Sequence, residues 1–270
     1  MIWKHVVGQE QTKKHLEYLI SSSQVPHAQI FTSQSGYGNL PLAISFSLAL
    51  LGKEVDPNAD ELLGKASQNP DLHFLYPVVK RGSETVAYSS DYAKECFSFL
   101  DQHPYGDYTD WFDYIEVGNK QGVIGVPEIE KLHHTLYLKA FGGGNKVCIL
   151  WGLEKLNAVG SNAFLKLLEE PPKNTYFILL CESNETILPT VLSRCQEINL
   201  GPIEEEALIK QIRGTHPNKK QMLVQANGSL RKLKKLLSSD ENREYETLLV
   251  EGLRYAFKAK GNQKIVIDLM

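Results

Sequence analysis

The sequence lacks three features that would point to a membrane, a secretory route or a metal site. No apolar run approaches the ~20 residues of a membrane-spanning helix, and the first residues form no secretory hydrophobic region. Cysteine is scarce and no C-x-x-C pair occurs, so no zinc site is expected. The four cysteines stand far apart, at Cys96, Cys148, Cys181 and Cys195. This composition favours the cytoplasm.

An excess of charge of either sign is also lacking. The chain holds 29 Lys and Arg against 32 Asp and Glu, which gives a net charge of -3. This balance argues against a protein that coats nucleic acid broadly, although it leaves room for one basic face. The 270 residues exceed one average domain, so two or three domains are expected.

A glycine-containing loop after the first apolar run has the form of a phosphate-binding loop without its charged groups. In the pattern G-x-x-x-x-G-K-[ST], the Lys reaches the β- and γ-phosphates and the hydroxyl holds Mg²⁺. Here Ser33 replaces the first Gly, Asn39 replaces the Lys and Leu40 replaces the hydroxyl residue. The turn-forming Gly36 and Gly38 are present. The nucleotide loop is therefore degenerate.

A second nucleotide motif is lost about a hundred residues later. The apolar run KVCIL at 146–150 is typical of a buried strand. In P-loop ATPases such a strand ends in the acids that hold Mg²⁺ and polarise water. Here Trp151 and Gly152 follow the run. Two losses in the right order indicate a structural relative of an ATPase that does not hydrolyse ATP.

Strand-like and helix-like segments alternate over the first 200 residues. This alternation predicts an α/β fold, in which a parallel sheet has helices on both faces. The expected strands are 29–32, 73–79, 146–150, 175–181 and 196–200, and the expected helices are 9–21, 42–51, 127–138, 161–170 and 187–192. After Gly201 and Pro202 only helices are expected. We therefore predict domains at 1–201, 202–240 and 241–270, the last being the start of a truncated helical domain.

Residues 81–122 carry many aromatic side chains and read as an insertion packed on the edge of the sheet. Two interpretations fit such a composition. The aromatic residues could stack on the bases of a single strand of nucleic acid, or they could form a small aromatic core. Lys and Arg are scarce in the segment, which favours the core.

Two sequence segments carry a family resemblance. They are NAFLKLLEEPP at 162–172 and LPTVLSRCQ at 188–196, and VGQE at 7–10 and VPHA at 25–28 agree with them. The chain resembles the clamp-loader branch of the AAA+ family over about residues 5–50 and 124–258. The resemblance implies an AAA+ P-loop domain, a helical lid over 202–240 and the beginning of a helical collar.

The resemblance assigns the Ser193-Arg194-Cys195 segment an arginine finger. Arg194 would reach the ATP site of a neighbouring subunit and stabilise charge on the γ-phosphate, a task suited to a planar, permanently charged group. The alternative is an internal salt bridge to an acidic side chain. The candidate acids are Glu169, Glu170 and Glu197.

The resemblance also places Arg231 at the sensor-2 position, which meets bound ATP in a competent member. The alternative that the residues favour is a solvated basic face. It would comprise Arg231, Lys232, Lys234 and Lys235.

Together these features imply a non-hydrolysing stator that binds neither ATP nor zinc. The family's four-Cys zinc module has no counterpart here, and the segment at 69–73 reads NPDLH. The implied partners are ATP-binding motor subunits, a wrench-like subunit, a sliding clamp and primed DNA, with no membrane. Two alternatives stay open: a divergent AAA+ ATPase that holds nucleotide through loop amides and a helix N-terminus, and an accessory protein that binds single-stranded DNA.

Overall fold

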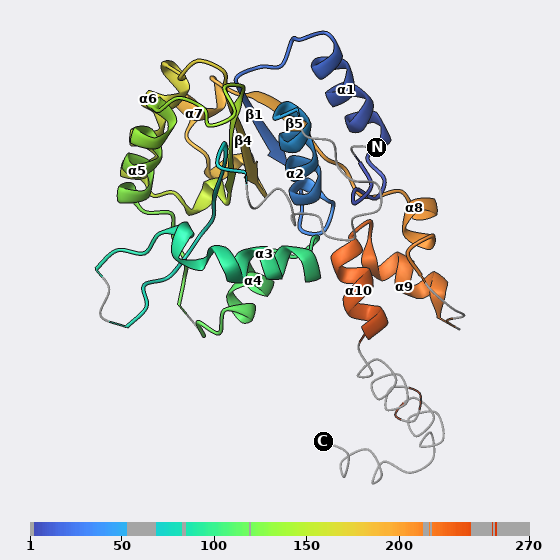
Figure 1. Cartoon of the computed structure of the whole chain (residues 1–270). Helices are drawn as coiled ribbons and strands as arrows, with labels where there is room; N and C mark the ends of the chain where they lie inside the picture. The colour runs from blue at the N-terminus through green and yellow to red at the C-terminus, as the bar shows by residue number, and fades with distance from the viewer. Residues whose placement is uncertain are drawn as a thin grey trace.

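A five-stranded parallel sheet organises the chain in the computed structural model (Figure 1). The structure describes residues 3–52, 69–82, 85–118, 120–212, 216, 218–238, 250 and 252. The strands lie in the order β2-β3-β4-β1-β5 and all neighbours are parallel. They are β1 (Ala28–Thr32), β2 (Leu72–Leu75), β3 (Lys146–Trp151), β4 (Thr175–Cys181) and β5 (Gln196–Asn199). The predicted α/β class and parallel sheet are confirmed.

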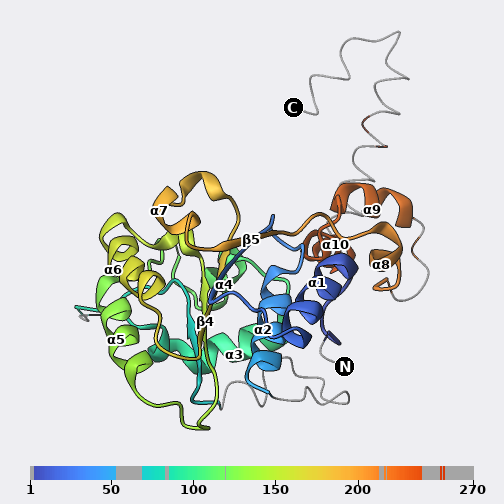
Figure 2. The same ribbon diagram turned by 90° about the horizontal axis from the view of Figure 1, so that it is seen from above.

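Helices cover both faces of this sheet, as Figure 2 shows from above. Because successive side chains of a strand point to opposite faces, Phe31 of β1 packs in one apolar cluster and Ile30 in the other. The Phe31 face is covered by α1 (Glu10–Ser21) and α2 (Asn39–Leu50), and the Ile30 face by α5 (Val126–Tyr137), α6 (Ala158–Glu169) and α7 (Pro189–Leu192). Both layers are needed because β3 and β4 are buried on both sides.

Several boundaries differ from the sequence prediction, such as the starts of α2 and α7. Two further differences have an identifiable local cause. Helix α6 begins at Ala158 rather than 161, because the Asn157 side chain caps it by accepting a bond from the Gly160 amide at 2.8 Å. Strand β2 ends at Leu75 rather than 79. Pro77 has no amide hydrogen to continue the ladder, and Val78 instead forms an isolated bridge with Val123.

The aromatic insertion folds as a 3₁₀ turn η2 (Ser89–Tyr92) followed by α3 (Ala93–Gln102) and α4 (Tyr108–Tyr114). Trp111 is its fully buried centre, with ring centroids of Tyr76 at 5.4 Å and Phe99 at 5.5 Å. The Trp111 indole donates to the Pro77 carbonyl at 2.9 Å. The predicted aromatic core is confirmed.

Three short helices follow the sheet: α8 (Glu205–Ile209), α9 (Lys219–Ala226) and α10 (Leu230–Ser238). They form a third apolar cluster centred on Leu208, Leu230 and Leu233. The boundary predicted at 201/202 falls in the loop between β5 and α8. Of the segment 241–270, only Val250 and Gly252 lie within the described residues. None of the helices in the described part of the chain combines the length and apolar character needed to cross a bilayer.

Candidate functional site: a filled nucleotide loop and a half-buried arginine

The degenerate loop joins β1 to α2, as a phosphate-binding loop does. Its two glycines leave space that other segments of the same chain occupy. Gly36 and Gly38 adopt φ angles of 84° and 100°, which favour glycine. A Cβ on Gly36 would lie 2.2 Å from the Ser229 hydroxyl. A Cβ on Gly38 would lie 3.0 Å from the Tyr105 ring. The glycines thus permit close approach of the helical segment and the insertion.

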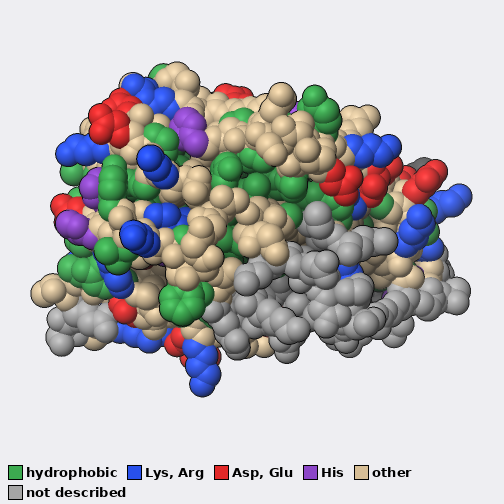
Figure 3. Space-filling model, turned by 45° about the horizontal axis from the view of Figure 1, so that its top comes forward, with side chains coloured by type: hydrophobic (Ala, Val, Ile, Leu, Met, Phe, Trp, Pro, Cys, Tyr) green, Lys and Arg blue, Asp and Glu red, His purple; other side chains and the backbone are tan. Residues whose placement is uncertain are grey.

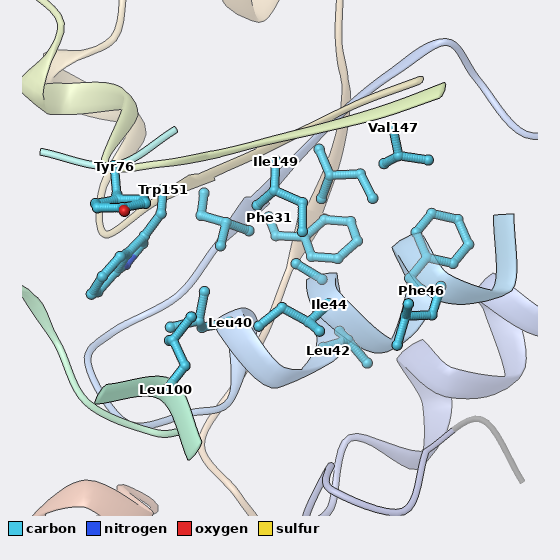
Figure 4. Close-up of a cluster of buried hydrophobic side chains, with 14 of the residues drawn as sticks. Phe31, Leu40, Leu42, Ile44, Phe46, Tyr76, Leu100, Val147, Ile149 and Trp151 are labelled. Atoms are coloured by element: carbon cyan, nitrogen blue, oxygen red, sulfur yellow. The ribbon is translucent and has the colours of Figure 1, made fainter. Parts of the chain in front are cut away.

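The two positions that meet Mg²⁺ and phosphate in a working loop serve the fold here. The Asn39 side chain accepts a bond from the Leu40 amide at 2.8 Å, at the first turn of α2. Leu40 is 1% exposed and belongs to the apolar cluster on this face of the sheet. Figure 4 shows Leu40 in this cluster together with Leu100 and Trp151. Neither position offers a cation or an Mg²⁺ ligand.

The end of β3 is occupied by aromatic rings. Trp151 is 3% exposed, and its ring centroid lies 5.0 Å from that of Tyr108. Gly152 has a φ of 92°, and a Cβ there would lie 3.2 Å from the Tyr108 ring. The insertion therefore packs over the carboxyl end of β3, not only along the edge of the sheet. Where an ATPase carries its acids, this chain has an apolar contact.

An ion-pair cluster joins the insertion to α10 beside the loop. Arg231 donates to both carboxylate oxygens of Asp110, with a distance of 2.9 Å from Nη2 to Oδ1. The same Nη2 lies 2.9 Å from Asp107 Oδ1. Lys235 Nζ lies 2.7 Å from Asp110 Oδ1, and the Ser35 hydroxyl of the loop donates to Asp107 at 2.9 Å. We call Asp107, Asp110, Arg231 and Lys235 the lid clip.

Three members of the lid clip, Asp107, Asp110 and Arg231, are largely shielded from solvent, while the Lys235 side chain is 58% exposed. Burial by itself would raise the pKa of Asp110, but hydrogen bonds from Arg231 and Lys235 outweigh it and lower that pKa to about 2. The Arg231 side chain is 16% exposed, so a solvated basic face is the wrong interpretation of Arg231. It lies beside the degenerate loop, with its ion pairs inside the chain.

Further hydrogen bonds to backbone carbonyls hold the same segments together. The Leu230 amide donates to the Gly36 carbonyl at 3.0 Å, and the Ser229 hydroxyl donates to the Ser35 carbonyl at 2.9 Å. The Tyr37 hydroxyl donates to the Asn227 carbonyl at 3.3 Å. Loop, insertion and α10 thus form one closed unit.

The sequence patterns did not identify Asp107 and Asp110 as partners of Arg231. Their local signal is a capping box: the Asp107 side chain accepts bonds from the amides of residues 109 and 110, and Asp110 accepts from the Asp107 amide. That signal predicts the start of α4. It does not reveal the partner, because Arg231 lies 121 residues further along the chain.

Arg194 lies just after α7 and is held by three acceptors. Nη2 donates to Glu169 Oε1 at 2.6 Å, and Nη1 donates to the Thr190 carbonyl at 2.8 Å and to the Ser193 hydroxyl at 3.4 Å. The side chains of Arg194 and Glu169 are 34% and 48% exposed. The predicted internal ion pair therefore exists with Glu169, while Glu197 instead accepts a bond from Asn184.

The residues that flank Arg194 shape the turn. Ser193 donates its hydroxyl to the Thr190 carbonyl at 3.1 Å. Burial raises the pKa of the Cys195 thiol to about 12, so it is not a thiolate nucleophile at neutral pH. Figures 1 and 2 place α7 next to α6 and apart from α10. The arginine and the filled loop are thus two separate sites.

Comparison with known proteins identifies the family. The profile described as "DNA polymerase III, delta subunit" matches residues 8–204. The chain belongs to this family. Relatives named "DNA polymerase III subunit delta'" include that of Haemophilus influenzae, 29% identical over 167 residues, which are 61% of this chain and 50% of the relative. That of Bacillus subtilis is 23% identical over 96% of this chain and 69% of the relative.

The delta-subunit family assignment agrees with the sequence reasoning. Two lost ATP motifs beside a retained Ser-Arg-Cys segment predict the delta-prime member of the clamp-loader branch, and these matches confirm it. The chain spans about half the length of the Haemophilus relative. A solved "DNA polymerase III, gamma subunit-related protein" of Thermotoga maritima has a TM-score of 0.50 at 16% identity, over 94% of this chain and 75% of that one. This similarity supports the AAA+ fold.

Within the described ranges, no three His, Cys, Asp or Glu side chains are grouped so as to hold a metal ion. The expectation that the chain binds neither zinc nor ATP stays a prediction.

Proposed function

We propose that this chain acts as a non-hydrolysing stator of the bacterial clamp loader, a part of the DNA polymerase III holoenzyme that is no enzyme by itself. The observation that carries this proposal is the lid clip. Arg231, the one cation at the sensor-2 position, is neutralised by Asp107 and Asp110, while Leu40 and Trp151 fill the places of the Mg²⁺ ligands. A nucleotide would meet carboxylates where it needs cations.

The second half of the proposal concerns Arg194. It would act in trans, contributing charge to the γ-phosphate in the ATP site of a neighbouring motor subunit. The partners are the motor subunits and the delta subunit and, through the complex, the sliding clamp and primed DNA. The side chain of Arg194 is 34% exposed against 16% for Arg231, and this difference supports the division of roles.

The chain is expected not to bind ATP. Binding would require a phosphate to displace two carboxylates from Arg231, at a loop where Asn39 stands in place of the Lys. Calorimetric titration with MgATP up to about 1 mM, the top of the usual range of enzyme KM values, is expected to show no saturable heat. A motor subunit titrated in parallel provides the positive control. Saturable binding would favour the divergent ATPase instead.

Single-strand DNA binding through the insertion lacks support. The large rings of Tyr92, Phe99 and Trp111 are buried and unavailable for stacking. Figure 3 shows acidic, basic and hydrophobic side chains interspersed over the described part of one face, without a continuous basic groove on it.

A further inference from the structure

The Arg194 guanidinium is already oriented in the isolated chain. An arginine side chain has several rotatable bonds, so a free one loses much conformational freedom when it is fixed in a site. Here the carbonyl of Thr190, the hydroxyl of Ser193 and the carboxylate of Glu169 accept three of its N–H groups. Two N–H groups of the five remain for a phosphate, on a side chain that is 34% exposed.

The position of Glu169 is not explained by helix stability. Glu169 is the last residue of α6, and Glu170 follows as its C-cap. Carboxylates at a helix C-terminus meet the negative end of the helix dipole, which disfavours them. The ion pair with Arg194 offsets this effect for Glu169. Among the contacts of the described residues, Glu170 takes part through its backbone, whose carbonyl accepts a bond from the Tyr137 hydroxyl.

We propose that Glu169 is the positioning residue of the arginine finger. It fixes the guanidinium plane through Nη2, while the turn after α7 fixes Nη1, so that the remaining donors point to the neighbouring subunit. Glu169 touches no substrate and acts only through Arg194. This inference rests on the proposed function of Arg194 in trans.

The test uses the clamp loader reconstituted with the full-length protein and measures its DNA-stimulated ATP turnover. Glu169→Ala is expected to lower kcat about tenfold and to leave KM for ATP unchanged, because substrate binding in the motor subunit is untouched. Glu169→Gln retains one acceptor oxygen, so its kcat should lie between those of the wild type and Glu169→Ala. Glu170→Ala, the adjacent carboxylate, should match the wild type.

A double-mutant cycle separates positioning from a general structural effect. In the Arg194→Ala background, Glu169→Ala should cause no further loss, since its effect passes through the arginine. Melting temperatures and complex assembly serve as controls for folding.

The possible failures are distinguishable. If Arg194→Ala leaves turnover unchanged, the proposed function itself fails. If Arg194→Ala lowers turnover while Glu169→Ala leaves turnover unchanged or raises it, only the positioning role of Glu169 is overturned. Additive losses in the double variant, or an equal loss with Glu170→Ala, would also overturn it.

Discussion

Replacing Arg194 with alanine is expected to lower ATP turnover by the reconstituted clamp loader by at least about tenfold, and by as much as about 10³-fold at the site that it serves. The reason is that the guanidinium supplies positive charge where negative charge develops on the γ-phosphate, in a site that excludes water. The other motor sites still hydrolyse ATP in the variant. Turnover by the whole complex therefore falls less than hydrolysis at the affected site. Single-turnover hydrolysis by the assembled complex is the measurement.

A matched arginine makes this result specific. Arg81 also forms a surface ion pair, with Glu95 at 2.7 Å, and its side chain is 46% exposed. Arg81→Ala should therefore leave turnover unchanged. Gel filtration of each complex verifies assembly. Normal turnover with Arg194→Ala would reduce Arg194 to a structural residue of the α7 turn.

The second large effect is expected on stability. Arg231→Ala would leave Asp107 and Asp110 with Lys235 as their remaining cation, at positions that are only 14% and 15% exposed. Breaking a buried ion pair from one side costs about 3–5 kcal/mol, and partial exposure reduces this to about 2–3 kcal/mol. Urea unfolding at neutral pH measures the loss.

Arg81→Ala is again the control, because an exposed ion pair contributes about 0–1 kcal/mol. Hydrogen exchange of the α10 amides would show where the loss arises. Exchange in α10 should accelerate more than exchange in β3 and β4, since the lid clip joins α10 to the insertion. Unchanged stability and exchange in Arg231→Ala would contradict an energetic role of the clip.

The lid clip also predicts a pH dependence. The pKa of Asp110 falls to about 2 in the folded chain from its ordinary value of 3.8. A carboxyl with a lowered pKa stabilises the fold above the unfolded value, and this contribution is lost as pH falls toward the folded value. Compared with the wild type, Asp110→Asn should be less stable at neutral pH. The difference in melting temperature should shrink between about pH 4 and pH 2.

Local patterns in the sequence revealed most of the fold. The apolar runs of β1, β3 and β4 and the helices between them were predictable because each element buries its own hydrophobic residues. The loss of the nucleotide-binding residues at positions 39, 40 and 151 could be predicted from the sequence, because the loop motif and the acids after the strand have fixed positions in a working site.

What escaped prediction depends on contacts between distant segments. Asp110 and Arg231 are 121 residues apart in the sequence, and the residues around each give no sign that the two form an ion pair. The aromatic residues of the insertion predicted a core, but its placement over β3 follows from Tyr108 packing on Trp151. The start of α6 was misplaced because the cap is Asn157, which lies before the apolar pattern begins.

The lid clip changes how the chain responds to its chemical surroundings. In a nucleotide-binding subunit, a diffusible ligand biases the angle between base and lid in proportion to its differential affinity for the two arrangements. Here the carboxylates of Asp107 and Asp110 are tethered to the chain, so their effective concentration at Arg231 is a property of the fold. If the chain binds no ATP, as we propose, the position of the lid would not change with the concentration of ATP in the cell.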